Sequence, residues 1–373
     1  MRPPPRVWVW TGVTVALVLV GVLLWRGSDA AATESTTAAA PHAPAGTPAA
    51  VVSRAWSATG TQPDDVLVGG RVLVGSPHGV RALDPVTGRE VWHYTRSNAH
   101  LCGVTATNGV AVAFFRTADR CNEVVALDAG TGVRAWTRNA NLRPDAVFTS
   151  TDRIVLAASP TGVVTFDPTG DTLRWRHKAP PGCLFLGAAV GSSGVAVLQH
   201  CPGAAATQLR LLDGFAGTSH WQRDLPAPDG TRIRLLGADQ LLGVVVGDEV
   251  RLLAGTDGAQ LRSLPLRPAA PALMRAAGTT ALVWLDGTLT SYEDTTATPR
   301  WHVAAEGLPA GPGSGTGPAA LLVPEKSGFV HRDVTTGRQL RRSAVSGLPA
   351  GGVADSIGAT IVYRLPDRIL AYR

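Results

Sequence analysis

Lysine and blocks of basic residues are scarce in this sequence. Lys178 and Lys326 are the only lysines among the 373 residues, so the net charge of +6 comes almost entirely from arginine. Charged residues make up 17%, and no Lys/Arg-rich stretch is interleaved with aromatic residues, as it is in many nucleic-acid-binding surfaces. We therefore expect no nucleic-acid ligand.

Recognisable catalytic motifs are also missing. The sequence contains no G-x-S-x-G, no H-E-x-x-H and no P-loop, and its nine histidines are scattered. No pair of cysteines has the C-x₂-C spacing that zinc ligands favour. We expect a protein that is not an enzyme and that binds no metal or cofactor.

One long apolar run lies near the N-terminus. Residues 7–25, VWVWTGVTVALVLVGVLLW, carry no charge, and about 20 such residues span a bilayer as a helix. Because Arg2 and Arg6 precede the run, we expect residues 1–6 in the cytoplasm, a signal-anchor helix over 7–25, and the rest of the chain outside the cell membrane. The alternative is a cleaved signal peptide and a secreted protein.

Residues 27–50 are rich in Ala, Thr and Pro and lack aromatic and large aliphatic side chains. Such a segment has nothing with which to build a core, so we expect a disordered tether. The remaining residues, 51–373, contain abundant glycine and proline, which favours many turns over long helices. They form the expected folded domain.

A short pattern recurs throughout this domain. ALDPVTGREVW (82–92) returns as ALDAGTGVRAW (126–136), and weaker copies end at Trp175, Trp221, Arg262, Trp301 and Arg341. The copies are spaced by about 42 residues, a period typical of propellers and solenoids. Each contains short β-rich runs parted by turns, which predicts four strands per unit and an all-β propeller.

The repeated residues have structural roles. We expect the Asp to accept backbone hydrogen bonds in a turn, the Gly to adopt a positive φ, and the Trp to pack against the next unit. A catalytic group would be needed only once, whereas these recur. The set comprises Trp56, Asp84, Gly88, Trp92, Asp128, Gly132, Trp136, Asp167, Trp175, Asp213, Trp221, Trp301, Asp333 and Gly337.

The pattern LDxxTGxxxW resembles the repeat of the PQQ-like (pyrroloquinoline-quinone-like) β-propeller family over residues 51–373. No repeated Trp is followed by Asp, unlike the WD40 repeat. The chain ends where the third strand of a unit should end, and residues 52–60 form an orphan fourth strand. Pairing the two gives eight four-stranded blades closed by the N-terminal strand; seven blades is the alternative.

Four cysteines occupy equivalent places in two units. Cys102 and Cys183 open an innermost strand, and Cys121 and Cys201 lie between the second and third strands. Those places meet at one end of a blade, so we expect the disulfides Cys102–Cys121 and Cys183–Cys201, as in an oxidising compartment.

The resemblance implies two functions. One is a non-enzymatic binding scaffold of the bacterial envelope; the alternative is a quinone- or metal-dependent oxidoreductase, although no two cysteines are adjacent here. We expect a monomeric scaffold that binds an unidentified protein or envelope ligand. The varied loops 177–182, 225–231 and 306–319 emerge on one face, which we expect to be the binding face.

Overall fold

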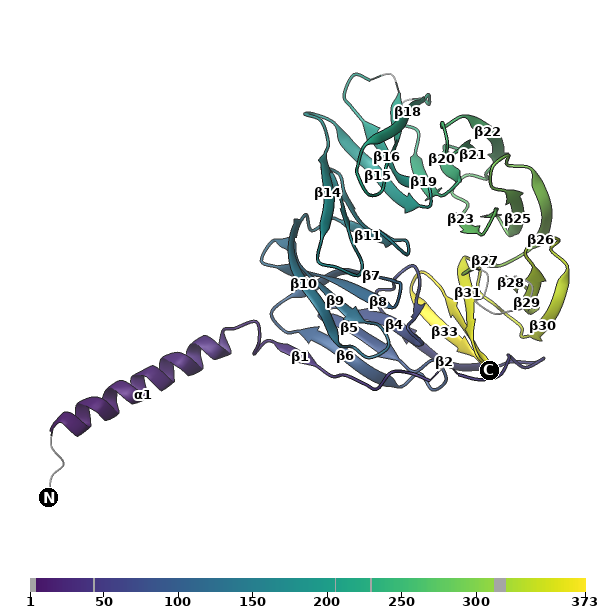
Figure 1. Cartoon of the computed structure of the whole chain (residues 1–373). Helices are drawn as coiled ribbons and strands as arrows, with labels where there is room; N and C mark the ends of the chain where they lie inside the picture. The colour runs from purple at the N-terminus through teal and green to yellow at the C-terminus, as the bar shows by residue number, and fades with distance from the viewer. Residues whose placement is uncertain (1–4, 43, 205, 229, 312–319) are drawn as a thin grey trace.

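The computed structural model describes residues 5–311 and 320–373, except residues 43, 205 and 229. These residues form an N-terminal helix, α1 (Pro5–Arg26), and eight β-sheets arranged as a ring (Figure 1). The sheets are the blades of an eight-bladed all-β propeller. The predicted architecture is confirmed, and the seven-bladed alternative is wrong.

Each blade runs in sequence from the ring axis outward. Blade 1 comprises β3 (Leu67–Val68), β4 (Arg71–Ser76), β5 (Gly79–Leu83) and β6 (Glu90–Arg96), and blade 2 comprises β7 (His100–Thr107), β8 (Val110–Thr117), β9 (Arg120–Asp128) and β10 (Arg134–Leu142). Blade 3 comprises β11 (Val147–Ser150), β12 (Val155–Ser159), β13 (Gly162–Phe166) and β14 (Leu173–Lys178), and blade 4 comprises β15 (Leu184–Gly191), β16 (Gly194–His200), β17 (Thr207–Leu212) and β18 (Ser219–Leu225).

Blades 5 to 8 continue the ring. Blade 5 comprises β19 (Ile233–Ala238), β20 (Leu241–Val246), β21 (Glu249–Ala254) and β22 (Gln260–Pro265), and blade 6 comprises β23 (Ala272–Ala277), β24 (Thr280–Leu285), β25 (Thr288–Glu293) and β26 (Pro299–Ala304). Blade 7 comprises β28 (Ala320–Glu325), β29 (Gly328–Asp333) and β30 (Gln339–Ala344), and blade 8 comprises β31 (Gly352–Ile357), β32 (Thr360–Arg364), β33 (Arg368–Tyr372) and β2 (Arg54–Thr59).

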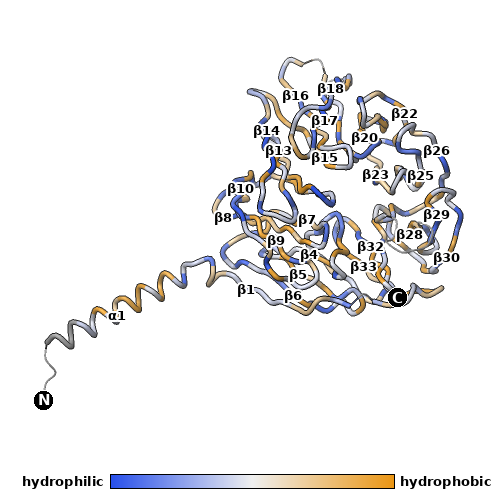
Figure 2. Tube along the Cα trace, viewed as in Figure 1, coloured by the Kyte–Doolittle hydropathy of each residue, from blue (hydrophilic) through white to orange (hydrophobic). Residues whose placement is uncertain are grey.

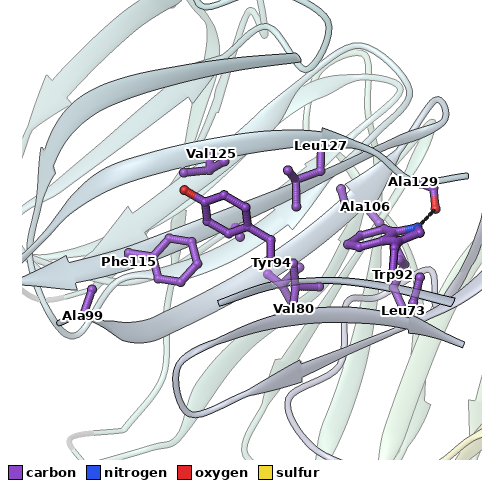
Figure 3. Packing of buried hydrophobic residues seen from close by; sticks show 14 residues of the cluster. Leu73, Val80, Trp92, Tyr94, Ala99, Ala106, Phe115, Val125, Leu127 and Ala129 are labelled. Carbon is purple, nitrogen blue, oxygen red and sulfur yellow. Dashed lines mark hydrogen bonds between the residues drawn. The ribbon is translucent and has the colours of Figure 1, made fainter. Parts of the chain in front are cut away.

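The burial of each strand follows its place in the blade. Every residue of β20, a second strand, is buried, because both of its faces pack against neighbouring blades. The outer strand β18 is exposed along most of its length. The core therefore lies between adjacent sheets, as Figure 3 shows for blades 1 and 2, where Trp92, Tyr94 and Phe115 pack together.

The ring is closed by the N-terminal strand. β2 pairs antiparallel with β33, with Arg54 opposite Tyr372 and Thr59 opposite Arg368. The predicted pairing of the orphan strand with the C-terminal blade is confirmed.

Blade 7 departs from the four-stranded rule. β27 (Gly307–Pro309), which occupies the sequence position of its first strand, pairs instead in parallel with β31 of blade 8. A Cβ atom on Gly307 would lie 2.0 Å from the carbonyl oxygen of Gly352, so this close backbone approach requires a glycine. Blade 7 consequently has three described strands.

The predicted disordered tether is wrong. Within residues 29–42 and 44–46, here called the strap, β1 (Thr33–Ser35) pairs antiparallel with β6, and the Ala38 amide donates to the Thr131 carbonyl of blade 2. Asp29 forms an ion pair of 2.8 Å with the buried Arg96. The strap binds largely through its backbone, which is why the absence of large side chains did not reveal it.

Helix α1 covers the predicted apolar run and projects away from the ring (Figure 1). Within the described part of the chain, no helix has both the length and the apolar character required of a membrane span. The predicted signal anchor is therefore not confirmed.

The two faces of the ring carry different connections. On one, the link face, lie the turns between second and third strands and the links from one blade to the next. On the other, the turn face, lie the first-to-second and third-to-fourth strand turns, including those of the repeated Asp residues.

Candidate functional site

The repeated Asp residues each hold a turn on the turn face. The Asp84 carboxylate accepts hydrogen bonds from the amides of Val86 (3.0 Å) and Thr87 (2.8 Å), and Asp333 does the same with Thr335 (3.1 Å) and Thr336 (2.7 Å). In both residues these hydrogen bonds go to Oδ1, so this oxygen holds the turn. These carboxylates fix the backbone of their turns, and we assign them a structural role.

The repeated Trp residues join each blade to the next. In every case the indole Nε1 donates to the carbonyl that follows the Asp position of the next blade. The pairs are Trp56 with Pro85, Trp92 with Ala129, Trp136 with Pro168, Trp175 with Gly214, Trp221 with Gly255 and Trp301 with Val334, at 2.8–3.3 Å.

Arginine replaces Trp in the two degenerate copies. Arg262 Nε donates to the Ala297 carbonyl of the next blade at 2.8 Å, and its guanidinium lies 6.0 Å from the Tyr292 ring centre. Arg341 instead contacts His331 within its own blade at 2.8 Å. Burial, followed by the nearby Arg341 charge, lowers the pKa of His331 to about 4.

Both predicted disulfides are present. Cys102 is bonded to Cys121 in blade 2 and Cys183 to Cys201 in blade 4, with Cα atoms 6.2 Å and 4.1 Å apart. Cys102 near the start of β7 is tied to Cys121 at the start of β9, and Cys183 before β15 to Cys201 in the connection between β16 and β17. Both therefore brace the link face.

Three exposed aliphatic side chains lie on the link face of blades 3 and 4. Val147 opens the first strand of blade 3 with 66% of its surface exposed, while Leu184 and Leu186 open that of blade 4, each 49% exposed. We call these three residues the apolar patch. Sequence reasoning missed them because apolar residues opening a strand look like ordinary core.

A cleft of about 200 Å³ opens on the same face between blades 2 and 3. Its floor is apolar, formed by Leu142, Ala146, Ala157, Ala158 and Val164, and its rim is basic, formed by Arg120, Arg143, Arg176 and Lys178. The His177 ring instead contacts the Gly217 carbonyl of blade 4 at 2.8 Å. We call it the cationic cleft. His177 and Lys178 belong to the predicted binding loop 177–182.

The other two predicted loops are less fully described. In loop 225–231, Ala227, Pro228, Gly230 and Thr231 line a pocket of about 210 Å³ together with Leu186 of the apolar patch. Residue 229 in this loop and residues 312–319 of the loop 306–319 lie outside the described residues.

A pocket of about 470 Å³ lies on the turn face at the turns of blades 3 to 5. Phe215, which is 50% exposed, forms one wall, with the Arg174 guanidinium 4.3 Å from its ring centre. Two of its carboxylates hold backbone amides: Asp213 accepts from two amides of its own turn, and Asp239 from the Ser192 amide. Asp152, Arg153 and Ser193 also line the pocket.

A charged cluster lies near the ring axis. Arg275 of blade 6 forms an ion pair of 2.9 Å with Asp65, which precedes blade 1. Burial raises the pKa of the nearby Asp355 to about 6, against the opposing hydrogen bond from the Ser356 amide. Among the described residues, no three His, Cys, Asp or Glu side chains gather as a metal site.

Part of the chain matches a known protein family in sequence. The family model described as "Outer membrane protein assembly factor BamB" matches residues 21–182, which include the strap and the first three blades. This match supports the predicted resemblance to the PQQ-like β-propeller family over these residues. Among curated proteins, none matches this PQQ-like propeller significantly in sequence.

Solved structures share the fold of this PQQ-like propeller at low identity. BamB from Moraxella catarrhalis is 14% identical, with a TM-score of 0.51 over 87% of this chain and 100% of that one. The computationally designed protein Ika8 is 12% identical, with a TM-score of 0.51 over 81% and 93%. The quinohemoprotein alcohol dehydrogenase ADHIIG from Pseudomonas putida HK5 is 12% identical over 86% and 76%, with a TM-score of 0.46. Similarity at this level establishes the fold alone.

Proposed function

We propose that this PQQ-like propeller is a non-enzymatic, monomeric scaffold that binds a protein partner on the link face, over blades 2 to 4. The observation that carries the proposal is the apolar patch, Val147 of blade 3 and Leu184 and Leu186 of the disulfide-bonded blade 4. Grouped exposed aliphatic side chains mark protein-binding surfaces. The disulfides hold this surface in shape, which lowers the entropy lost on binding.

Pull-down experiments test the partner site. The variant Val147→Ser/Leu184→Ser/Leu186→Ser should lose partner capture from envelope extracts while keeping the wild-type melting temperature, because all three side chains are solvent-exposed. Val133→Ser is the matched control, since Val133 is 53% exposed and follows the Asp128 turn on the turn face. Capture that survives the triple variant and fails in Val133→Ser would place the partner on the other face.

We further propose that α1 anchors the propeller in the cell membrane, with residues 1–6 in the cytoplasm and the propeller outside. One support is α1, along which hydrophobic residues recur (Figure 2) and where Trp10 and Leu24 are each 71% exposed. The other is the disulfides, which suit an oxidising compartment. Because Asp29 is ion-paired to Arg96, blade 1 would then lie beside the bilayer.

Topology reporters test the anchor. A periplasmic reporter fused after Arg373 should be active and its cytoplasmic counterpart inactive, with the fusion retained in the membrane fraction. A soluble mature protein whose N-terminus falls between residues 30 and 50 would show cleavage and release instead.

Among the residues that the structure describes, we find no geometry that favours the alternative oxidoreductase. All four cysteines are in disulfides between residues 19 and 18 positions apart, so no adjacent pair faces a quinone. The described carboxylates near the ring axis lie beside the guanidinium groups of Arg275 and Arg364. These residues do not fit a quinone with its calcium ion, and adding PQQ and Ca²⁺ should leave the absorbance spectrum a simple sum of its components.

A further inference from the structure

The cationic cleft has a charge imbalance that its own residues do not relieve. Arg143 is paired with Asp145 at 2.9 Å, and this hydrogen bond lowers the pKa of Asp145. Of the described residues that line the cleft, none carries a carboxylate. Arg120, Arg176 and Lys178 have no ion-pair partner within 4.0 Å in the described chain. Three cations thus converge on one small opening, and an anion in it would relieve their mutual repulsion.

Two of these cations are already fixed in place. Arg176 Nη2 of blade 3 donates to the Ala140 carbonyl at 2.6 Å, and Arg120 Nη2 of blade 2 donates to the next carbonyl, that of Asn141, at 3.4 Å. Arg120 is also adjacent to the disulfide-bonded Cys121. Side chains held in this way lose less entropy when they bind a ligand.

The shape of the cleft narrows the class of anion. Its floor is made of buried aliphatic side chains, with Leu142 only 5% and Val164 only 3% exposed. A bare inorganic anion would bring no apolar group to this floor, whereas a carboxylate carried on methylene groups would. The volume of about 200 Å³ suits one side chain and not a larger ligand.

The cleft and the apolar patch meet along the chain at the start of blade 3. Ala146 forms part of the cleft floor, and the next residue, Val147, is the most exposed member of the patch. A partner segment seated on both would place an acidic side chain in the cleft and aliphatic side chains on the patch.

We propose that the cationic cleft binds a glutamate or aspartate side chain of an acidic–aliphatic segment of the partner protein. The inference rests on the proposed function, because it names the chemistry of the partner bound at the same face. Charge-assisted hydrogen bonds from Arg176 and Arg120 hold the carboxylate, and Lys178 adds an unpaired charge at the rim.

Fluorescence anisotropy with a defined probe tests the proposal. A short labelled peptide of alternating Glu and Leu should bind the full chain at least about tenfold more tightly than its Gln–Leu counterpart, as expected for hydrogen bonds to a charged group. The difference should shrink with added salt. Arg176→Gln/Lys178→Gln should abolish it, while the control Arg153→Gln/Lys326→Gln, which alters an exposed arginine on the turn face and the only other lysine, should preserve it.

Three results would overturn the inference. Equal binding of the two peptides would show that the cleft does not recognise a carboxylate. Displacement of the probe by inorganic phosphate at equal concentration would assign the cleft to a free anion. Loss of the preference in the control variant alone would place the site elsewhere. If Arg176→Gln/Lys178→Gln still captures the partner while the triple serine variant does not, the cleft inference fails and the proposed function stands; capture unaffected by either variant refutes the proposed function itself.

Discussion

The indole ring of Trp92 in blade 1 lies directly over Gly132 in blade 2. A Cβ atom on Gly132 would come within 2.8 Å of two ring carbons, and the indole Nε1 donates 3.0 Å to the Ala129 carbonyl of the same turn (Figure 3). The turn therefore needs a residue without a side chain at position 132 and a free carbonyl oxygen at position 129. The pairs Trp56–Gly88 and Trp301–Gly337 repeat the relationship at other blade interfaces.

Gly132→Ala should destabilise the fold much more than a glycine change in an open turn. Gly109→Ala is the matched control, because its φ of +76° equals the +77° of Gly132 but its Cβ would meet no atom within 4 Å. We expect Gly109→Ala to lower the free energy of unfolding by about 1 kcal/mol, because alanine is disfavoured in the left-handed backbone conformation. Gly132→Ala should lower it by about 2 kcal/mol more, because the new methyl group displaces the indole ring. Urea unfolding measures both; equal losses would show that Trp92 adjusts freely.

How far the sequence predicts this structure depends on whether a feature repeats. The Asp, Gly and Trp positions recur, so their period gave the blade number and the ring closure, and the cysteines recur in equivalent places. The strap does not repeat and binds through backbone groups such as the Ala38 amide, so its composition suggested disorder.

The cationic cleft was equally invisible to sequence reasoning. Arg120 and Arg176 come from different blades and meet only because the links of those blades converge. Arginines spread along a chain have no pattern that separates them from solvated surface charges. The predicted loop 177–182 located this region only through its unusual composition.

Ring closure makes stability depend on the N-terminal strand. A chain starting at residue 61 lacks β2 and leaves the backbone groups of β33 unpaired, so it should be insoluble or unfolded by circular dichroism. A chain starting at residue 28 keeps both the strap and β2 and should melt like the full chain. Compared with that chain, one starting at residue 47 lacks only the strap. Its melting temperature should be lower, but its unfolding should remain cooperative. Equal melting of all three would show that β2 does not close the ring.

Removing one disulfide should weaken the chain by a moderate amount. The Cys102–Cys121 bond closes a loop with a separation of 19 residues, for which the chain-entropy model gives about 3 kcal/mol. We expect Cys102→Ser/Cys121→Ser to lose about that much in urea unfolding under oxidising conditions. Under reducing conditions the wild-type advantage should disappear, and a persistent difference would point to packing of the serine side chains instead.

Asp355 should make the propeller less stable as the pH rises. Its pKa of about 6 in the folded chain exceeds the unfolded value of about 3.9, so the folded state retains a proton that the unfolded state has lost. Stability from this group is therefore full below pH 4, falls between pH 4 and 6, and stays low above pH 6.

Asp355→Asn should remove this dependence, because an amide can still accept the hydrogen bond from the Ser356 amide and needs no charge near the ring axis. We expect the variant to be about 2 kcal/mol more stable than the wild type at pH 7.5 and equal to it at pH 4. Other titrating groups, such as His331, are common to both proteins and cancel in the difference. Asp119→Asn, in an exposed turn, serves as the control and should change stability by less than about 0.5 kcal/mol at either pH. A stabilisation of Asp355→Asn that is the same at pH 4 and pH 7.5 would show that the effect comes from packing or from Arg275 and Arg364, and not from the proton on Asp355.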